Sequence, residues 1–309
     1  MRLKYIKNSK IFLSIEVVTF IFFLCIIIFK GFNLGIDFTG GSLFQFQYQQ
    51  GTTVSAVQSE MSTLTQQFPD LKDSVVQSSG NNTMNIRTTA LSESEKESVT
   101  SSMLSAFPNA QLQSYELIGP TISSQLVKSG ILAVIVGCIA IILYITIRFE
   151  FSFAMGGIIA LVHDIVMAAG IISLIGWQID STFIAAILTI LGYSINDTIV
   201  IFDRIRENKK KYYNKDTFEN IIDNSISETF TRSINSSVTT CLAILAMLVF
   251  GGLTLHTFLL TLLVGIISGT YSSIFVASPI VYLFEERRRK KGKPKKQKIK
   301  IEVSEGGTV

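Results

Sequence analysis

Residues 182–202 read TFIAAILTILGYSINDTIVIF, an apolar stretch that contains a short cluster of polar side chains. An α-helix rises 1.5 Å per residue, so about 20 residues cross a hydrocarbon core of about 30 Å. The stretch is therefore long and apolar enough to form a transmembrane helix. Its polar side chains, above all Asp197, are costly inside a membrane and need an explanation.

Further apolar segments lie at 11–29, 131–147, 153–175, 237–250 and 258–283. The segment at 131–147 reaches full length once its flanking residues are added. The segment at 237–250 is short unless it continues through Ser233 and Leu255. Together the six segments predict a polytopic α-helical membrane protein with six transmembrane helices.

The composition excludes several classes of protein. Of the 309 residues, 48% are hydrophobic and 16% are charged, which excludes a disordered chain. The two histidines and three cysteines lie far apart in the sequence, and each cysteine is inside an apolar segment. We therefore expect no zinc site, no disulfide framework and no cofactor.

The distribution of lysine and arginine predicts the orientation. Basic residues gather at 1–10, at 203–232 and in the tail after 286, whereas 31–127 has three basic and eight acidic residues. Since lysine and arginine are retained on the cytoplasmic side, both termini and 203–232 are expected to be cytoplasmic. The predicted parts are 1–30 (N-terminus and first helix), 31–127 (extracytoplasmic domain), 128–285 (five helices with a cytoplasmic loop at 203–232) and 286–309 (cytoplasmic tail).

The segment 31–127 is long enough for a small α/β domain. Residues 42–49 alternate between aromatic and glutamine side chains, as in a half-buried strand, and 53–68 has helical spacing. Short strands are expected at 74–78 and 84–88, and Ser92 and Glu95 form a capping box for a helix that reaches Phe107. A strand at 111–118 completes the order βαββαβ, which indicates a ferredoxin-like domain. We find no nucleophile beside a base in it and predict that it is not an enzyme.

The first and third predicted helices contain three acidic or histidine side chains between them. Glu16 is about two turns from the cytoplasmic end of the first helix, where we expect it to snorkel to the membrane interface or to pair with another residue there. His163 and Asp164 lie midway along the third helix. They either make a hydrogen-bonded contact between helices or handle protons, because histidine titrates near neutral pH.

The fourth and fifth helices carry a richer polar pattern. Tyr193 and Asp197 are i,i+4 neighbours on one face, and Asn196 lies beside them. Arg232, with Ser236, Thr239 and Thr240, follows in the next segment. An acid on one helix facing a base and hydroxyls on another would form either an ionisable path or a static contact between helices. In the sixth segment, Gly265 and Gly269 have the GxxxG spacing of a close-packing face.

Two other features have simpler interpretations. The glycine-rich stretch 35–41 lacks the preceding strand and following helix of a nucleotide-binding fingerprint, so we exclude phosphate binding. The basic tail has no interleaved aromatic residues. It favours contact with anionic membrane lipids and fixing of the topology over nucleic-acid binding.

Several of these stretches together resemble a known family. They are GIDFTGG at 35–41, LTILGYSINDTIVIFDRIREN at 188–208, and the shorter matches Gly119-Pro120, His163-Asp164, Thr239-Thr240 and GTYSS at 269–273. The chain resembles the SecF branch of the SecD/SecF family of protein-export membrane proteins, which is similar to the resistance-nodulation-division transporters. The resemblance covers residues 1–285.

The resemblance implies a function. A SecF-like chain would act with SecD in the bacterial cytoplasmic membrane and assist Sec-dependent translocation by using the proton-motive force. Its partners would be SecD, the SecYEG channel and the exported unfolded polypeptide. Asp197 and Arg232 match the residues that the family assigns to proton coupling. Residues 236–240 read SSVTT where the family often has a Thr-Ser pair before Thr-Thr, so the hydroxyls are kept.

Two other functions fit the sequence less well. A proton-coupled small-molecule efflux subunit of the same superfamily would share this architecture, but such subunits have two large external loops and about twelve crossings. A membrane enzyme would need paired catalytic groups at one surface, and the sequence shows none. A protein-translocation subunit is the reading that fits best.

Overall fold

The computed structural model describes residues 5–80, 82–212, 215–252 and 255–292. Within these residues, six helices are long and apolar enough to cross a membrane. They are α1 (Ser9–Lys30), α5 (Pro120–Arg148), α6 (Phe151–Ile175), α7 (Ser181–Tyr212), α8 (Phe218–Phe250) and a sixth at 256–289. The sixth consists of α9 (His256–Ser272), the π-helical turn η3 (Ser273–Ala277) and the start of α10 (Ser278–Gly292). The prediction of six transmembrane helices is confirmed.

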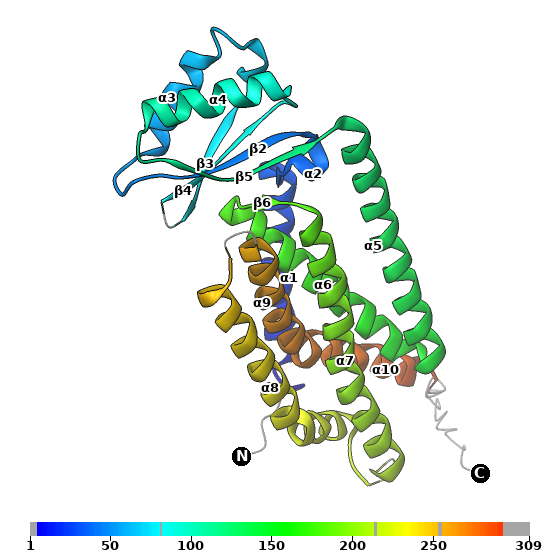
Figure 1. The fold of residues 1–309 in the computed structure, drawn as a ribbon. Coiled ribbons are helices and arrows are strands. Elements are labelled where there is room, and N and C mark those ends of the chain that lie inside the picture. Colours follow the sequence, from blue (N-terminus) through cyan, green and yellow to red (C-terminus); the bar gives the residue numbers. More distant parts are fainter. Residues whose placement is uncertain (1–4, 81, 213–214, 253–254, 293–309) are drawn as a thin grey trace, which may run out of the picture.

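The helices form a bundle with an inner and an outer set. Half of the apolar stretch is buried in α6 and in α7, against 6% in α1 and in α5. The helices α6, α7 and α9 are therefore central, and α1, α5 and α8 pack around them (Figure 1). The N-terminal end lies at the same end of the bundle as the α7–α8 connection, where the backbone N–H of Ile6 donates to Asp223 at 2.9 Å.

Several helices are longer than the apolar segments predicted. The segment 203–232, expected to be a loop, is mostly helical, because α7 continues to Tyr212 and α8 begins at Phe218. Polar contacts hold the two extensions together: Asn208 donates to Ser225 at 3.0 Å and to Glu228 at 2.9 Å. The segment expected at 237–250 thus extends through Ser233, but it ends at Phe250 and does not reach Leu255.

The helix expected at 131–147 also begins earlier. Its first residue is Pro120, a residue favoured at the first helical position because its missing N–H would have no helical partner. Part of the basic tail lies in α10, and residues 293–309 lie outside the described residues.

The α/β domain sits between α1 and α5. Its elements are β2 (Gly41–Gln47), α3 (Val54–Leu64), η1 (Pro69–Leu71), β3 (Val75–Gly80), β4 (Thr83–Thr88), α4 (Glu93–Ala106) and β5 (Gln111–Ile118). The sheet order is β3-β4-β2-β5, and every neighbouring pair is antiparallel. This is the ferredoxin-like topology, so the predicted domain type is confirmed.

The domain has its own hydrophobic core. The fully buried side chains of Phe44 and Phe46 on β2 meet Met61 of α3, Ile86 of β4 and Met103 of α4. The aromatic face of the sheet is therefore covered by α3 and α4, which lie on the side away from the bundle (Figure 1). The predicted capping box is present, since Ser92 N–H donates to Glu95 Oε2 at 2.8 Å and Glu95 N–H donates to Ser92 Oγ.

A short junction joins the domain to the bundle. Strand β1 (Asn33–Leu34) pairs in parallel with β6 (Gln178–Ile179), which lies between α6 and α7. The short helix α2 (Ile36–Thr39) follows, and Asp37 accepts a hydrogen bond from Ser181 N–H at 2.7 Å at the start of α7. Gly41 has a φ of 123°, and a Cβ there would collide with the carbonyl oxygen of Thr88, so this position requires glycine.

Candidate functional site: ionisable residues inside the bundle

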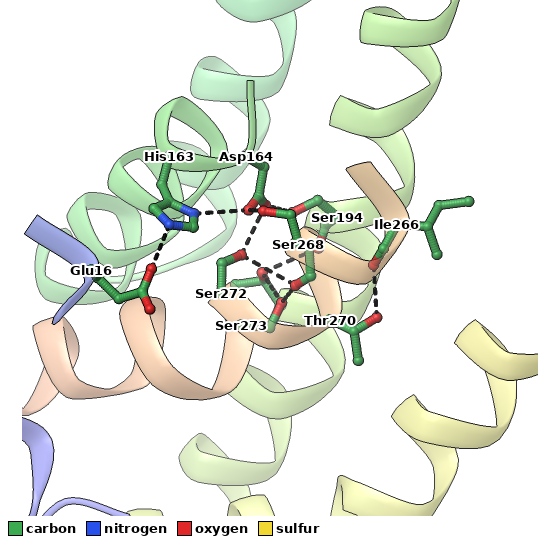
Figure 2. Close-up of polar contacts among 11 residues, drawn as sticks. Glu16, His163, Asp164, Ser194, Ile266, Ser268, Thr270, Ser272 and Ser273 are labelled. Atoms are coloured by element: carbon green, nitrogen blue, oxygen red, sulfur yellow. Dashed lines mark hydrogen bonds and ion pairs between the residues drawn. The ribbon is translucent and has the colours of Figure 1, made fainter. Parts of the chain in front are cut away.

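His163 on α6 stands between two carboxylates. Its Nε2 lies 2.7 Å from Glu16 Oε2 on α1, and its Nδ1 lies 3.1 Å from Asp164 Oδ1 (Figure 2). All three side chains are buried, and Asp164 is completely inaccessible. The hydroxyl of Tyr271 on α9 is also within hydrogen-bonding reach of Glu16. The three residues form one continuous polar connection from α1 into the centre of the bundle.

Asp164 is surrounded by serine hydroxyls from two other helices. Ser194 of α7 donates to Oδ2 at 2.6 Å, and from α9 Ser272 donates to Oδ2 at 2.8 Å and Ser268 to Oδ1 at 2.8 Å (Figure 2). The carboxylate therefore ties together the three central helices. These are short hydrogen bonds to a buried acceptor, and they compensate for the water that Asp164 has lost.

The hydroxyl network continues beyond Asp164. Thr198 Oγ1 of α7 lies 2.8 Å from Ser273 Oγ and donates to the Ser194 carbonyl at 3.1 Å. Apart from this network, Thr270 Oγ1 donates to the Ile266 carbonyl at 3.0 Å (Figure 2). It is also within hydrogen-bonding distance of Ser237 Oγ on α8. This separate contact between Thr270 and Ser237 joins α9 to α8.

Asp197 lies on α7 in a different environment. It is buried, and its Oδ2 atom has no hydrogen-bond partner among the described residues. The buried Ser233 hydroxyl on α8 likewise makes no hydrogen bond there. The Ser233 hydroxyl nevertheless lies at the edge of hydrogen-bonding reach of the Asp197 carboxylate, and Arg232 is near enough to act on that carboxylate electrostatically. The two residues predicted for proton coupling are therefore neighbours across the α7–α8 contact.

The residues predicted to support this pair separate into three groups. Tyr193 Oη lies 3.2 Å from Thr240 Oγ1 and 3.5 Å from Ser236 Oγ, so these three connect α7 to α8. Within the described part of the chain, Thr239 bonds only to carbonyls of its own helix, and Asn196 is exposed on α7. His163 and Asp164 belong instead to the network around α6 and α9.

The predicted glycine face lies where α9 packs on α7. A Cβ at Gly269 would come 2.8 Å from the Ser194 Cβ, and a Cβ at Gly265 would collide with Ile190. The close approach lets Ser194 and Ser272 reach the same Asp164 oxygen. The glycines therefore position the network, in agreement with the predicted close-packing role.

Sequence reasoning did not connect Glu16 with His163. The sequence predicted snorkelling or pairing at the membrane interface for Glu16, whereas the structure buries it against His163 inside the bundle. The available signal was the presence of an acid in one apolar segment and a histidine in another. That signal allowed Glu16 to meet polar residues on several different helices, because nothing in the sequence shows that α1 packs on α6.

The fold and these residues define a class of protein. A six-helix membrane protein with a small α/β domain and buried ionisable residues has the features of proteins that move ions or substrates across membranes. The sequence profile for the protein export membrane proteins SecD/SecF, C-terminal, matches residues 98–287, and the SecD/SecF GG motif matches residues 26–52. The chain belongs to the SecD/SecF family of protein export membrane proteins.

Individual relatives agree with this assignment. The chain is 44% identical to the protein translocase subunit SecF of Sebaldella termitidis, over 96% of both chains. It is 37% identical to that of Haemophilus influenzae, over 96% of this chain and 90% of the relative. The crystal structure of SecDF, a translocon-associated membrane protein from Thermus thermophilus, is 33% identical and superposes with a TM-score of 0.85.

A second solved structure shows SecDF in a super-membrane-facing form. It superposes with a TM-score of 0.70 at 32% identity. The two matches cover 93% and 94% of this chain, but 39% and 40% of the SecDF chains. The chain thus spans about two fifths of the solved SecDF chains and nearly all of the curated SecF relatives.

Proposed function

We propose that this chain is the SecF-type half of a SecD–SecF assembly that assists Sec-dependent protein translocation across the bacterial cytoplasmic membrane. The observation that carries this proposal is the match over 96% of both chains to a relative named as a SecF translocase subunit. The solved SecDF chains are more than twice as long as the part that this chain covers. We infer that a separate SecD chain supplies the remainder.

The orientation proposed from the charges fits the placement of the elements. The α/β domain lies at one end of the bundle, and the N-terminal end and α7–α8 connection lie at the other (Figure 1). Arg148, Arg204, Arg206 and Lys209 gather at that second end. We infer that it faces the cytoplasm, with both termini, and that residues 31–127 are extracytoplasmic.

Proton coupling is assigned to Asp197 with Arg232. A buried carboxylate oxygen without a hydrogen-bond partner is costly, and natural proteins retain such groups mainly where they serve a function. Arg232 is exposed on this chain, so it is available to a SecD surface as well as to Asp197. Proton binding would neutralise Asp197 and remove the electrostatic attraction between its carboxylate and Arg232.

The α/β domain contributes binding, with no part in catalysis. Its aromatic sheet face is already covered by α3 and α4, so that face does not receive an exported chain. The opposite face carries Gln45, Gln47 and Asn85 and is turned toward the bundle. We infer that this polar face and the sheet edges meet the exported polypeptide as it leaves the SecYEG channel.

The test is reconstitution with defined partners. The chain, tagged and coexpressed with a SecD-type subunit, is expected to co-purify with it and to raise the yield of proton-gradient-dependent export through SecYEG in vesicles. Vesicles with SecYEG alone provide the control. Stable isolation without a SecD-type partner, or equal export with and without the pair, would contradict the proposal.

A further inference from the structure

The hydrogen bonds around His163 determine where the protons of the network are. Asp164 has four groups directed at it: the hydroxyls of Ser194, Ser268 and Ser272, and His163 Nδ1. Each hydroxyl donates, and imidazole is more basic than a carboxylate in water. Asp164 is therefore the ionised acceptor, and His163 Nδ1 carries a proton that it donates to Oδ1.

The other ring nitrogen has a different requirement. With Nδ1 protonated, a neutral imidazole presents a lone pair at Nε2, and an ionised Glu16 presents only lone pairs as well. The two atoms are 2.7 Å apart, which is a hydrogen-bond distance. One additional proton must therefore lie between them, either as imidazolium with carboxylate or as imidazole with carboxylic acid.

Loss of that proton would make the arrangement unfavourable. Two acceptors would face each other at 2.7 Å, and two buried carboxylates would flank one neutral ring. Like charges that share a buried site repel, and an unpaired buried charge is strongly destabilising. Because Glu16 is on α1 and His163 on α6, the strain would act between these two helices.

We propose that Glu16 and His163 form a proton-binding site, separate from Asp197, whose shared proton fastens α1 to α6. The pair binds and releases its proton as a unit, so the proton belongs to the contact between the helices. The site goes beyond the proton coupling proposed for Asp197 and Arg232. Its ligand is the proton itself.

The position of α1 gives this contact a consequence. Helix α1 is peripheral and leads directly into β1 and β2 of the α/β junction and domain. Its other contacts with α6 do not depend on a titratable pair: Phe23 packs against Gly170, and Lys30 Nζ donates to the Leu174 carbonyl at 2.6 Å. Release of the Glu16–His163 proton would therefore loosen the N-terminal half of α1 from α6. The C-terminal half of α1, which leads into the domain, would keep its other contacts.

The groups around the pair come from every helix that packs nearby. Tyr271 of α9 faces Glu16, Asp164 of α6 faces His163, and Tyr193 and Asp197 of α7 lie on either side of Ser194. The turn η3 contains no titratable residue. Among the described residues, no lysine or arginine bonds to Glu16, His163 or Asp164, so the shared proton is the cation of this site.

The experiment measures the separation of α1 and α6 against pH. Spin labels are placed at Val18 on α1 and Val162 on α6, which are exposed and outside the network, in the SecD-bound complex with Cys25, Cys138 and Cys241 replaced. We expect a short distance at low pH and a longer, broader distribution at high pH. Glu16→Gln should keep the short distance at every pH, because an amide can donate to His163 Nε2 without titrating.

Glu16→Leu provides the matched variant without a donor and should show the long distribution at every pH. A distance that is independent of pH in the unsubstituted pair, or a pH response retained in Glu16→Gln, would overturn the proposal. Asp197→Asn separates this proposal from the proposed function. It should lose gradient-dependent export and still show the pH-dependent change between α1 and α6.

A second readout needs no substitution at Glu16. The chain contains only two histidines, so ¹⁵N-labelled imidazole signals of the complex can be assigned to this site by comparison with His163→Gln. We expect the His163 Nε2 signal to change over the same pH range as the spin-label distance. A signal typical of an ordinary neutral imidazole, without a hydrogen bond at Nε2 at any pH, would contradict the shared proton.

Discussion

Gly269 on α9 lies directly against Ser194 on α7, so closely that an added Cβ would come 2.8 Å from the Ser194 Cβ. Ser194 is also a donor to Asp164 at 2.6 Å. The absence of a side chain at one position thus allows a hydrogen bond at another. This relationship makes the packing of the bundle testable.

Gly269→Ala should destabilise the complex by about 1–3 kcal/mol, the usual cost of overpacking a tight core. The measurement is the midpoint of thermal unfolding in detergent or lipid. Gly192→Ala on α7 is the matched control, because nothing lies within 4 Å of a Cβ there. Equal midpoints for the two variants would show that the α7–α9 contact is not as tight as the structure indicates.

Asp197→Asn should assemble with the SecD subunit in normal amounts and lose the proton-gradient-dependent part of export. Arg232→Ala should lose it too. The reason is that asparagine keeps the shape of the side chain but cannot gain or lose a proton at this site. Export is measured in vesicles with and without an imposed proton gradient.

Asp203→Asn is the control for this prediction, since Asp203 is a half-exposed carboxylate paired with Arg148 and Arg206 at the end of the bundle. It should retain gradient-dependent export. Full gradient dependence of export in Asp197→Asn would contradict the assignment of proton coupling to this residue. Loss of export caused by dissociation of the complex would contradict it as well.

The orientation is tested with single cysteines in a cysteine-free background. Ser78→Cys in the α/β domain should react with an impermeant thiol reagent added to intact cells or spheroplasts, and Lys215→Cys should react only after lysis. Both positions are exposed. Reaction of the cysteine at 215 from outside would reverse the proposed topology.

Removal of 42–117 should abolish stimulation of export while leaving insertion into the membrane intact. The cut is geometrically mild, because Gly41 and Ile118 are paired neighbours on β2 and β5 and a short glycine-serine link can join them. The domain core is also separate from the bundle core. Undiminished stimulation by the shortened chain would show that another element handles the substrate.

Ser92→Ala should weaken the start of α4 by about 1 kcal/mol, the usual value of an N-cap side chain. Amide hydrogen exchange in α4 should therefore become about fivefold faster than in the parent complex. Ser101→Ala, in an exposed position within the same helix, should leave the protection of the first turn unchanged.

The effect of the cap should depend on pH. Hydrogen bonds from Ser92 hold the pKa of Glu95 below its usual value of 4.5. A depressed pKa in the folded state means that this part of the stability is present above pH 4.5 and is lost as the pH falls through the folded-state pKa. The ratio of exchange rates between Ser92→Ala and its parent should therefore shrink below about pH 4.5.

Local patterns predicted much of the architecture. The alternation of Phe44 and Phe46 with glutamines predicted a strand with one buried face, and Ser92 with Glu95 predicted a helix start. These predictions held because each depends on residues within a few positions of one another. The ends of α7 and α8 were predicted less well, since Asn208 and Glu228 extend the helices through contacts that no local hydropathy pattern contains.

The sequence by itself determined how many times the chain can cross a membrane, the expected orientation, the order of elements in the α/β domain and the family. Each follows from the hydropathy and charge of continuous segments or from short motifs. Only the tertiary structure decided which polar residues meet. Glu16 and His163 are 147 positions apart. The helices of this bundle are apolar on nearly every face, so hydropathy does not determine which helix packs against which. Close packing against small residues such as Gly170 and Gly269 therefore decides which buried polar groups meet.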